Sequence, residues 1–231
     1  GEARRCRKLC KDDEAAKLLH RVVKAAPELA EAQALLGHVL LDLAQEKDFA
    51  DWHRRLPAEV SSHSEIWFVR GAWAETNKKP KAAARSYWEA VKRNPNHRRA
   101  IYRLARVLDS LDRKSQTKEL FERAKMLSEL KQAAADIYEK GPEHEPMQRA
   151  ARLTEDLGRL WEAWGWHAAT LAKSADSASE DPTVRQEFNR LRAILDREPL
   201  PRTLASANPA ARIDLSSFPS PNISSQVSSK I

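Results

Sequence analysis

Large and small apolar residues return along the chain with a period of 34 residues. Between residues 64 and 97, large residues stand at positions 4 and 24 of the period, and small residues stand at positions 8, 11, 20 and 27. Because residues three or four apart share one face of a helix, this spacing predicts two antiparallel helices that approach closely at the small positions. A proline at position 32 is expected to end the pair. The residues concerned are Trp67, Gly71, Ala74, Ala83, Tyr87, Ala90 and Pro95.

The same period continues towards the N-terminus. Residues 30–63 carry Leu36 and Gly37 at positions 7 and 8, which predicts a first helix of the same kind. The second helix of this repeat is less regular. Phe49 stands where alanine is expected, and Pro57 is expected to end the helix early.

Further repeats are expected on both sides of these two. Residues 98–131 hold Leu104 and Ala105 at positions 7 and 8 and Ala124 at position 27, so a third hairpin is expected there. A half repeat is expected over residues 1–29, because it carries the second-helix pattern and its closing proline.

This combination of residues resembles the tetratricopeptide repeat (TPR) family, whose signature asks for small residues at 8, 20 and 27 and an aromatic residue at 24. Arg70 departs from the signature, because leucine is usual at position 7. The resemblance implies an all-α fold, a right-handed superhelical solenoid of antiparallel helix hairpins. Each hairpin of such a stack buries its apolar face against the next one.

The register is lost after Lys131. Residues 115–140 contain no helix breaker and are expected to form one long helix or two abutting helices. A divergent hairpin fits about 144–177, with Gly158 at the turn position 15. An aspartate and a proline then form a helix start, and apolar residues at helical spacing predict a capping helix over about 182–197.

The elements together predict one helical-repeat domain over residues 1–197 and a Pro/Ser-rich extended tail or linker over residues 198–231. Leu215 and Phe218 are expected to pin a short extended piece of this tail. The composition agrees with an all-α domain, because only 6 of 231 residues are glycine and charged residues make up 32%.

Three tryptophans fall within the stretch RLWEAWGWH, residues 159–167. In the register of the divergent hairpin, Trp164 is expected in the core. Trp166 falls at position 23 of its repeat, as Trp52 does in an earlier one, and this recurrence indicates packing between adjacent repeats. A platform for a ring-shaped ligand is the alternative, but second helices line the outer side in repeats of this kind.

The resemblance places ligands in the concave groove, which the first helices line mainly through positions 2, 5, 9 and 12. In residues 98–131 three arginines recur at i, i+4 and i+7 on one face, with a tyrosine beside them. Residues 92–131 hold 12 Lys or Arg and 5 Asp or Glu, a balance of +7 that equals the net charge of the whole chain. The predicted ligand-contacting residues are His38, Phe68, Arg99, Tyr102, Arg103 and Arg106.

Two interpretations of the arginine row stay open. The row either clamps an acidic peptide or a carboxylate, or it is a solvated face whose arginines pair with acidic neighbours in the next repeat. The sequence contains no Gly-rich phosphate loop, no serine nucleophile motif and no histidine pair at metal-ligand spacing. We therefore expect a non-catalytic protein-interaction scaffold without a cofactor or metal.

The alternative function is RNA binding through the basic Arg/Tyr stripe around residues 98–106. The whole layout also resembles, more loosely, bacterial multidomain proteins in which a TPR array precedes an FG-GAP-type propeller with an ASPIC-type region. That resemblance implies a fragment whose partners include other domains of the same parent protein, and an exported parent. No apolar run is long enough to span a membrane, and the compartment stays open.

Overall fold

The computed structural model describes most of the chain, and every regular element in the described part is a helix. The chain divides into two compact units. The first contains the residues up to Arg113 and those from Asp214 onward, and the second contains Lys114–Ile213. The first unit is therefore built from two separate stretches of sequence. The described residues are 2–9, 11–141, 143–175, 181–197 and 203–223.

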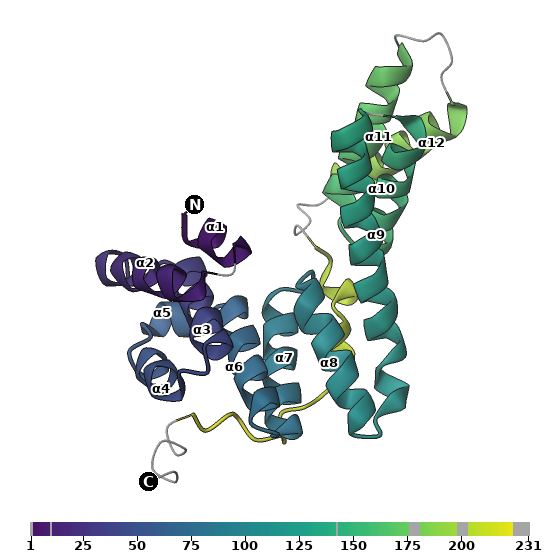
Figure 1. Cartoon of the computed structure of the whole chain (residues 1–231). Helices are drawn as coiled ribbons and strands as arrows, with labels where there is room; N and C mark the ends of the chain where they lie inside the picture. Colours follow the sequence, from purple (N-terminus) through teal and green to yellow (C-terminus); the bar gives the residue numbers. More distant parts are fainter. Residues whose placement is uncertain (1, 10, 142, 176–180, 198–202, 224–231) are drawn as a thin grey trace. The chain divides into compact units, whose positions relative to one another are not determined.

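The first unit holds successive antiparallel helices (Figure 1). The first helices of the predicted hairpins begin at residues 30, 64 and 98, and the second helices begin at residues 12, 46 and 80. Both series keep the predicted spacing of 34 residues. The helices are α1 (Glu2–Lys8), α2 (Asp12–Ala25), α3 (Ala30–Asp42), α4 (Glu46–Arg54), α5 (Ala58–Ser61), α6 (Ser64–Thr76), α7 (Pro80–Arg93) and α8 (Arg98–Ser110).

The turns after the first helices repeat with the same period. Ala44, Lys78 and Asp112 each adopt a positive φ of 54–61° at position 15. The residue after each turn donates its N–H to a carbonyl five residues earlier, as in the bond from Lys79 to Ala74 O. This is the Schellman arrangement, which satisfies the last carbonyls of a helix. Gly158 ends the first helix of the divergent hairpin in the same way, with φ 73°.

Close approach within the hairpins depends on small residues at position 8. A Cβ atom added to Gly71 of α6 would lie 2.5 Å from the ring of Tyr87 of α7. A Cβ added to Gly37 of α3 would lie 2.4 Å from the ring of Trp52 of α4. The pairing of position 8 with an aromatic side chain on the second helix is thus realised in both hairpins.

Trp52 corrects one sequence prediction. It was expected to pack between adjacent repeats, but its ring packs inside its own hairpin against Gly37, and its indole N–H donates to Gln33 Oε1 at 2.9 Å. Phe49 makes the contact with the next repeat instead, because its ring stacks on Trp73 of α6 at 6.4 Å and 3°. The large residue at the alanine position displaces the contact between repeats by one helical turn.

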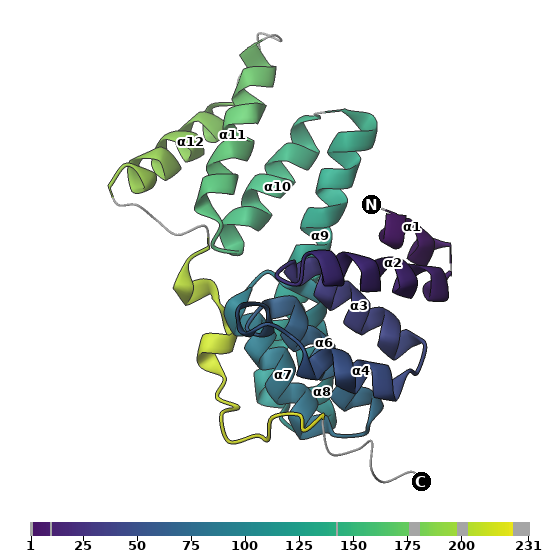
Figure 2. The ribbon, with the colours of Figure 1, turned by 90° about the vertical axis from the view of Figure 1, so that its left-hand side faces the viewer.

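The second unit is also helical (Figure 2). The region after Lys131 continues one long helix, α9 (Lys118–Lys140), which confirms the first of the two forms expected there. α10 (His144–Asp156) and α11 (Leu160–Ala175) pack as the divergent hairpin. α12 (Pro182–Leu195) packs on α11 and confirms the predicted helix. Three 3₁₀ turns complete the unit, at η1 (Lys114–Gln116), η2 (Ala205–Ala207) and η3 (Pro209–Arg212).

Two tryptophans of α11, Trp161 and Trp164, make ring contacts. The ring of Trp164 stacks on Phe188 of α12 at 5.3 Å and meets Trp161 edge-on at 6.4 Å. Trp164 and Trp166 are half-buried, so Trp164 is less enclosed than the expected core position. Its contact with α12 shows that it joins successive helices.

The tail passes from the second unit back to the first. We name residues 214–223 the tail segment; it has no helix or strand and contains one turn closed by the bond from Phe218 N–H to Leu215 O at 3.0 Å. Leu215 is fully buried, as the sequence predicted for a pinned piece, and Ile223 is 3% exposed. The parts of the predicted tail at 198–202 and 224–231 lie outside the described residues.

Candidate functional site

Three first helices, α3, α6 and α8, present side chains to one pocket of about 320 Å³ in the first unit. α3 contributes His38, α6 contributes Phe68, and α8 contributes Arg99 and Arg103. Four of the six residues predicted to contact a ligand therefore line a single pocket. The other lining residues are Leu41, Asp42, Ala72, Glu75, Thr76 and Tyr87.

The remaining two predicted residues lie elsewhere on α8. Arg106 lines a second pocket of about 430 Å³ with Lys78 and Glu75, and Glu75 also lines the first pocket. Tyr102 lines neither pocket, and it is 47% exposed. The arginine row therefore lines the two pockets, and Tyr102 does not.

Arg103 is held by the preceding hairpin. Its Nη1 donates to Glu75 Oε1 of α6 at 3.0 Å, and the hydroxyl of Tyr87 donates to the other oxygen of Glu75 at 2.8 Å. Burial and the adjacent Glu75 carboxylate raise the pKa of Tyr87, so its hydroxyl keeps its proton. Arg103 thus pairs with an acidic neighbour, but this neighbour stands in the preceding repeat and not in the next one, where the sequence interpretation placed it.

Phe68 forms the floor of the pocket. It is 2% exposed, and its ring lies between those of His38 at 5.3 Å, Tyr87 at 5.5 Å and His97 at 4.9 Å. The guanidinium of Arg99 lies over the same ring, 4.6 Å from its centroid. A cation over an aromatic face is attracted by the ring quadrupole, so Phe68 positions Arg99.

His38 brings a buried polar atom to the pocket. The residue is 8% exposed, and its Nε2 has no hydrogen-bond partner among the described residues. Burial, and secondarily the positive charges of Arg99 and Arg7, lower the pKa of His38 from 6.5 to about 3. The imidazole is therefore neutral at physiological pH and contributes no charge to the pocket.

The carboxylates around the pocket already have partners inside the protein. Asp42 pairs with Arg7 of α1, and Glu75 pairs with Arg103. Glu65 Oε1 lies 3.1 Å from Nε2 of His97, and this contact, opposed by burial, holds the pKa of Glu65 below its usual value.

Two cations differ from these pairs. Within the described residues, neither Arg99 nor Arg106 forms an ion pair. Of the three arginines in the predicted row, only Arg103 is therefore ion-paired among the residues that the structure describes.

Sequence reasoning missed part of this arrangement. Asp42 was not predicted at the pocket, although it directly follows the groove position held by Leu41. Tyr87 was assigned to the hairpin core, and it serves both the core and the pocket because its ring faces Gly71 while its hydroxyl reaches Glu75. An aromatic residue with a polar end at position 24 was the signal that could have found it.

Two other kinds of site are absent from the part of the chain that the structure describes. No group of three or more His, Cys, Asp or Glu side chains there is placed to hold a metal ion. None of the described helices combines the length and the apolar character that a membrane crossing requires.

Comparisons with known proteins give information on the fold alone. No protein-family model matches the chain, and no curated protein matches it. Solved structures with a similar arrangement include MamA, at 20% identity and a TM-score of 0.43, over 76% of this chain and 96% of that one.

Two further similar structures are TPR proteins. TTC0263, a thermophilic TPR protein from Thermus thermophilus, has 20% identity and a TM-score of 0.41 over 83% of this chain and 95% of its own. YrrB, a TPR protein with an unusual peptide-binding site, has 15% identity and a TM-score of 0.37 over 74% and 81%. The looser resemblance to FG-GAP/ASPIC-type proteins gains no support. The description of the chain as a TPR-like helical repeat rests on its own hairpins, above all on the contact of Gly71 with Tyr87.

Proposed function

We propose that the chain is a non-catalytic protein-interaction scaffold, whose groove along α3, α6 and α8 binds an acidic peptide segment of a partner protein. The observation that carries the proposal is the pairing of charges in the groove. Arg99 and Arg106 form no ion pair among the described residues, whereas the lining carboxylates Asp42 and Glu75 are both paired.

An acidic side chain or a terminal carboxylate suits these two cations. A guanidinium offers several donors in a plane and binds a carboxylate through two parallel hydrogen bonds. Arg99 is already placed over the ring of Phe68, so less side-chain freedom is lost when a ligand binds. His38 Nε2 offers one further polar contact at the pocket wall without adding charge.

RNA binding through residues 98–106 fits the groove less well. A phosphate backbone binds through many cations, whereas of the three arginines in the row only Arg99 and Arg106 are without an ion pair among the described residues. The comparisons give no support to it either.

The proposal is tested by selecting ligands from a random peptide library displayed on phage. We expect the wild-type chain to select peptides enriched in Asp and Glu. The Arg99→Glu/Arg106→Glu variant is expected to lose this enrichment, and the selected peptides should bind it at least tenfold more weakly in fluorescence anisotropy.

The matched control is Lys17→Glu/Arg152→Glu, which changes the net charge equally at exposed positions that line neither pocket. It should bind the peptides like the wild type. No acidic enrichment with the wild type, an equal loss in the control variant, or tighter binding of single-stranded oligouridine than of any selected peptide would each overturn the proposal.

A further inference from the structure

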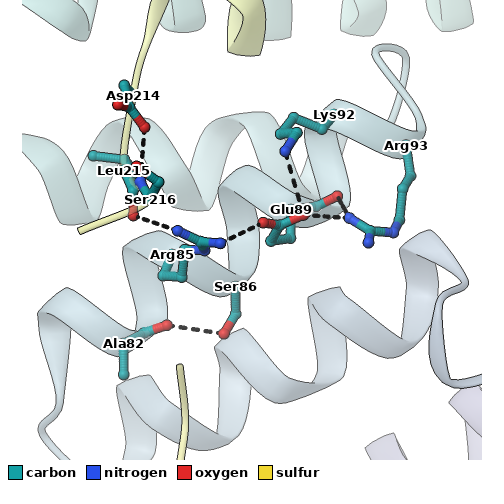
Figure 3. A network of polar contacts seen from close by, with 9 residues as sticks. All are labelled: Ala82, Arg85, Ser86, Glu89, Lys92, Arg93, Asp214, Leu215 and Ser216. Atoms are coloured by element: carbon teal, nitrogen blue, oxygen red, sulfur yellow. Dashed lines mark hydrogen bonds and ion pairs between the residues drawn. The ribbon is translucent and has the colours of Figure 1, made fainter. Parts of the chain in front are cut away.

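The tail segment lies against α7, on the side of this helix that presents Arg85, which we name the outer face of α7. Arg85 of α7 donates from Nη1 to the backbone carbonyl of Leu215 at 2.9 Å (Figure 3). Leu215 and Ile223 are buried, and the guanidinium of Arg113 lies over the ring of Phe218 at 5.5 Å. The segment is thus held by apolar side chains and one clamp on its backbone.

Arg85 is fixed by α7 itself. Its Nη2 pairs with Glu89 Oε1 at 2.9 Å, and its guanidinium lies 4.9 Å from the ring centroid of Trp88. Glu89 is 6% exposed and is also paired with Arg93 and Lys92 (Figure 3). Burial raises the pKa of Glu89, but these three cations outweigh it and leave the pKa below its usual value. The Arg85 guanidinium, which donates to the carbonyl of Leu215, is therefore held in place by residues outside the tail.

The tail segment has the chemistry of a bound peptide. Asp214 is its single charged residue, and it satisfies the N–H of Ser216 at 2.8 Å. Pro219 and Pro221 restrict the backbone, which lowers the entropy lost on ordering. Its contacts with Arg85 of α7 and with Arg113 use one backbone carbonyl and one aromatic side chain, as peptide recognition by pockets does.

We propose that the outer face of α7 is a second peptide-binding site, which takes a Ser/Pro-rich peptide with a Leu-x-x-Phe turn and which the tail segment occupies in cis. A peptide of the same kind on a partner protein competes with the tail. The tail has the advantage of a high effective concentration because it is covalently attached. The site is independent of the groove proposed above, since none of its residues lines that pocket.

The test uses the full chain and a fluorescein-labelled peptide with the sequence of residues 211–223, ARIDLSSFPSPNI. A Leu215→Asp substitution should release the tail, because an ionised side chain cannot stay fully buried there. We expect this variant to bind the peptide at least tenfold more tightly than the wild type does. Adding Arg85→Ala should remove the gain, and Ser220→Asp, at an exposed position of the tail, should behave like the wild type.

A second measurement keeps the inference testable if Leu215→Asp does not fold. Excess unlabelled peptide added to the wild type should raise the hydrogen-exchange rate of the Phe218 amide, because displacement opens its bond to Leu215 O. A folded Leu215→Asp chain that binds no better than the wild type, or an exchange rate that the peptide leaves unchanged, would show that the tail is a fixed part of the fold.

Discussion

At the scale of single residues, two hairpins depend on the space that a glycine at position 8 leaves for an aromatic ring of the second helix. Tyr87 is fully buried against Gly71, and Trp52 fills the equivalent space against Gly37 from one residue earlier in its repeat. A side chain added at Gly37 or Gly71 would occupy the volume of these rings. Interiors are packed too densely for such an addition without strain.

Gly71→Ala tests this close approach. We expect it to lower the free energy of unfolding by about 1–2 kcal/mol, because overpacking costs more than the gain in helix propensity. Urea unfolding followed by circular dichroism measures the change. Gly165 of α11 is the matched control, since a Cβ there meets nothing within 4 Å, and Gly165→Ala should raise stability by about 0.5–1 kcal/mol. Equal stabilisation by both substitutions would contradict the packing argument.

How far the sequence could predict the groove is also decided by single residues. The repeat register predicted four groove residues that line one pocket, namely His38, Phe68, Arg99 and Arg103. The register did not predict which guanidinium groups are ion-paired. The pairing of Arg103 with Glu75 joins residues 28 positions apart and depends on how two helices pack. Spacing predicts which residues share a face, but not which of them are already paired.

At the scale of the elements, Arg70 explains how an irregular repeat is tolerated. α4 ends at Arg54, as Pro57 predicted, and the short α5 follows. Arg70, at the position where the signature asks for leucine, is 8% exposed and reaches this segment. Its Nε donates to His53 Nε2 at 2.9 Å, and its other nitrogens donate to Ser61 O and Oγ. The arginine at position 7 of one repeat thus stabilises the irregular second helix of the repeat before it.

Restoring the signature residue should therefore be harmful. We expect Arg70→Leu to lower the free energy of unfolding by about 1–3 kcal/mol, since it leaves half-buried acceptors on His53 and Ser61 without their donor. Hydrogen exchange at the Ser61 amide, which donates to Pro57 O, should accelerate. Arg98→Leu makes the same exchange at an exposed position and should leave both measurements unchanged.

The pH dependence gives this prediction a second readout. Burial, and secondarily Arg70, lower the pKa of His53 from 6.5 to about 4. Since the folded state takes up the proton less readily than the unfolded state, stability should fall as the pH drops from about 6.5 towards 4. Arg70→Leu should weaken this dependence. A variant as stable as the wild type, with the same pH profile, would show that the clamp contributes nothing.

The repeat pattern does not predict where α9 begins. A strict period of 34 residues from the start of α7 at Pro80 would begin the next second helix at Lys114, but η1 stands at Lys114–Gln116 and α9 begins at Lys118. Position 20 of this repeat is Thr117 rather than alanine, and its hydroxyl bonds to Lys114 O at 2.9 Å. A threonine hydroxyl offers the backbone an alternative to the helix ladder, so the helix starts later than the period alone predicts.

At the scale of the whole molecule, the first unit is discontinuous in sequence. It is completed by residues from Asp214 onward, after the chain has formed the second unit. The bond of Arg85 to Leu215 joins residues 130 positions apart. Composition showed a Pro/Ser-rich tail, and helical periodicity has no means of showing where such a segment returns, because it contains no helix.

This topology predicts the order of folding. Contacts between distant residues carry the larger loop-closure cost, so the tail segment should dock after α6, α7 and α8 have packed. We expect Leu215→Ala to cost about 2 kcal/mol and to speed unfolding of the first unit about thirtyfold, with the folding rate nearly unchanged. Stopped-flow urea jumps combined with pulsed hydrogen exchange at α6 and α7 amides measure both rates. Ser220→Ala, at an exposed position of the same segment, should change neither. A folding rate that falls as much as the unfolding rate rises would mean that the tail docks early and guides the unit into place.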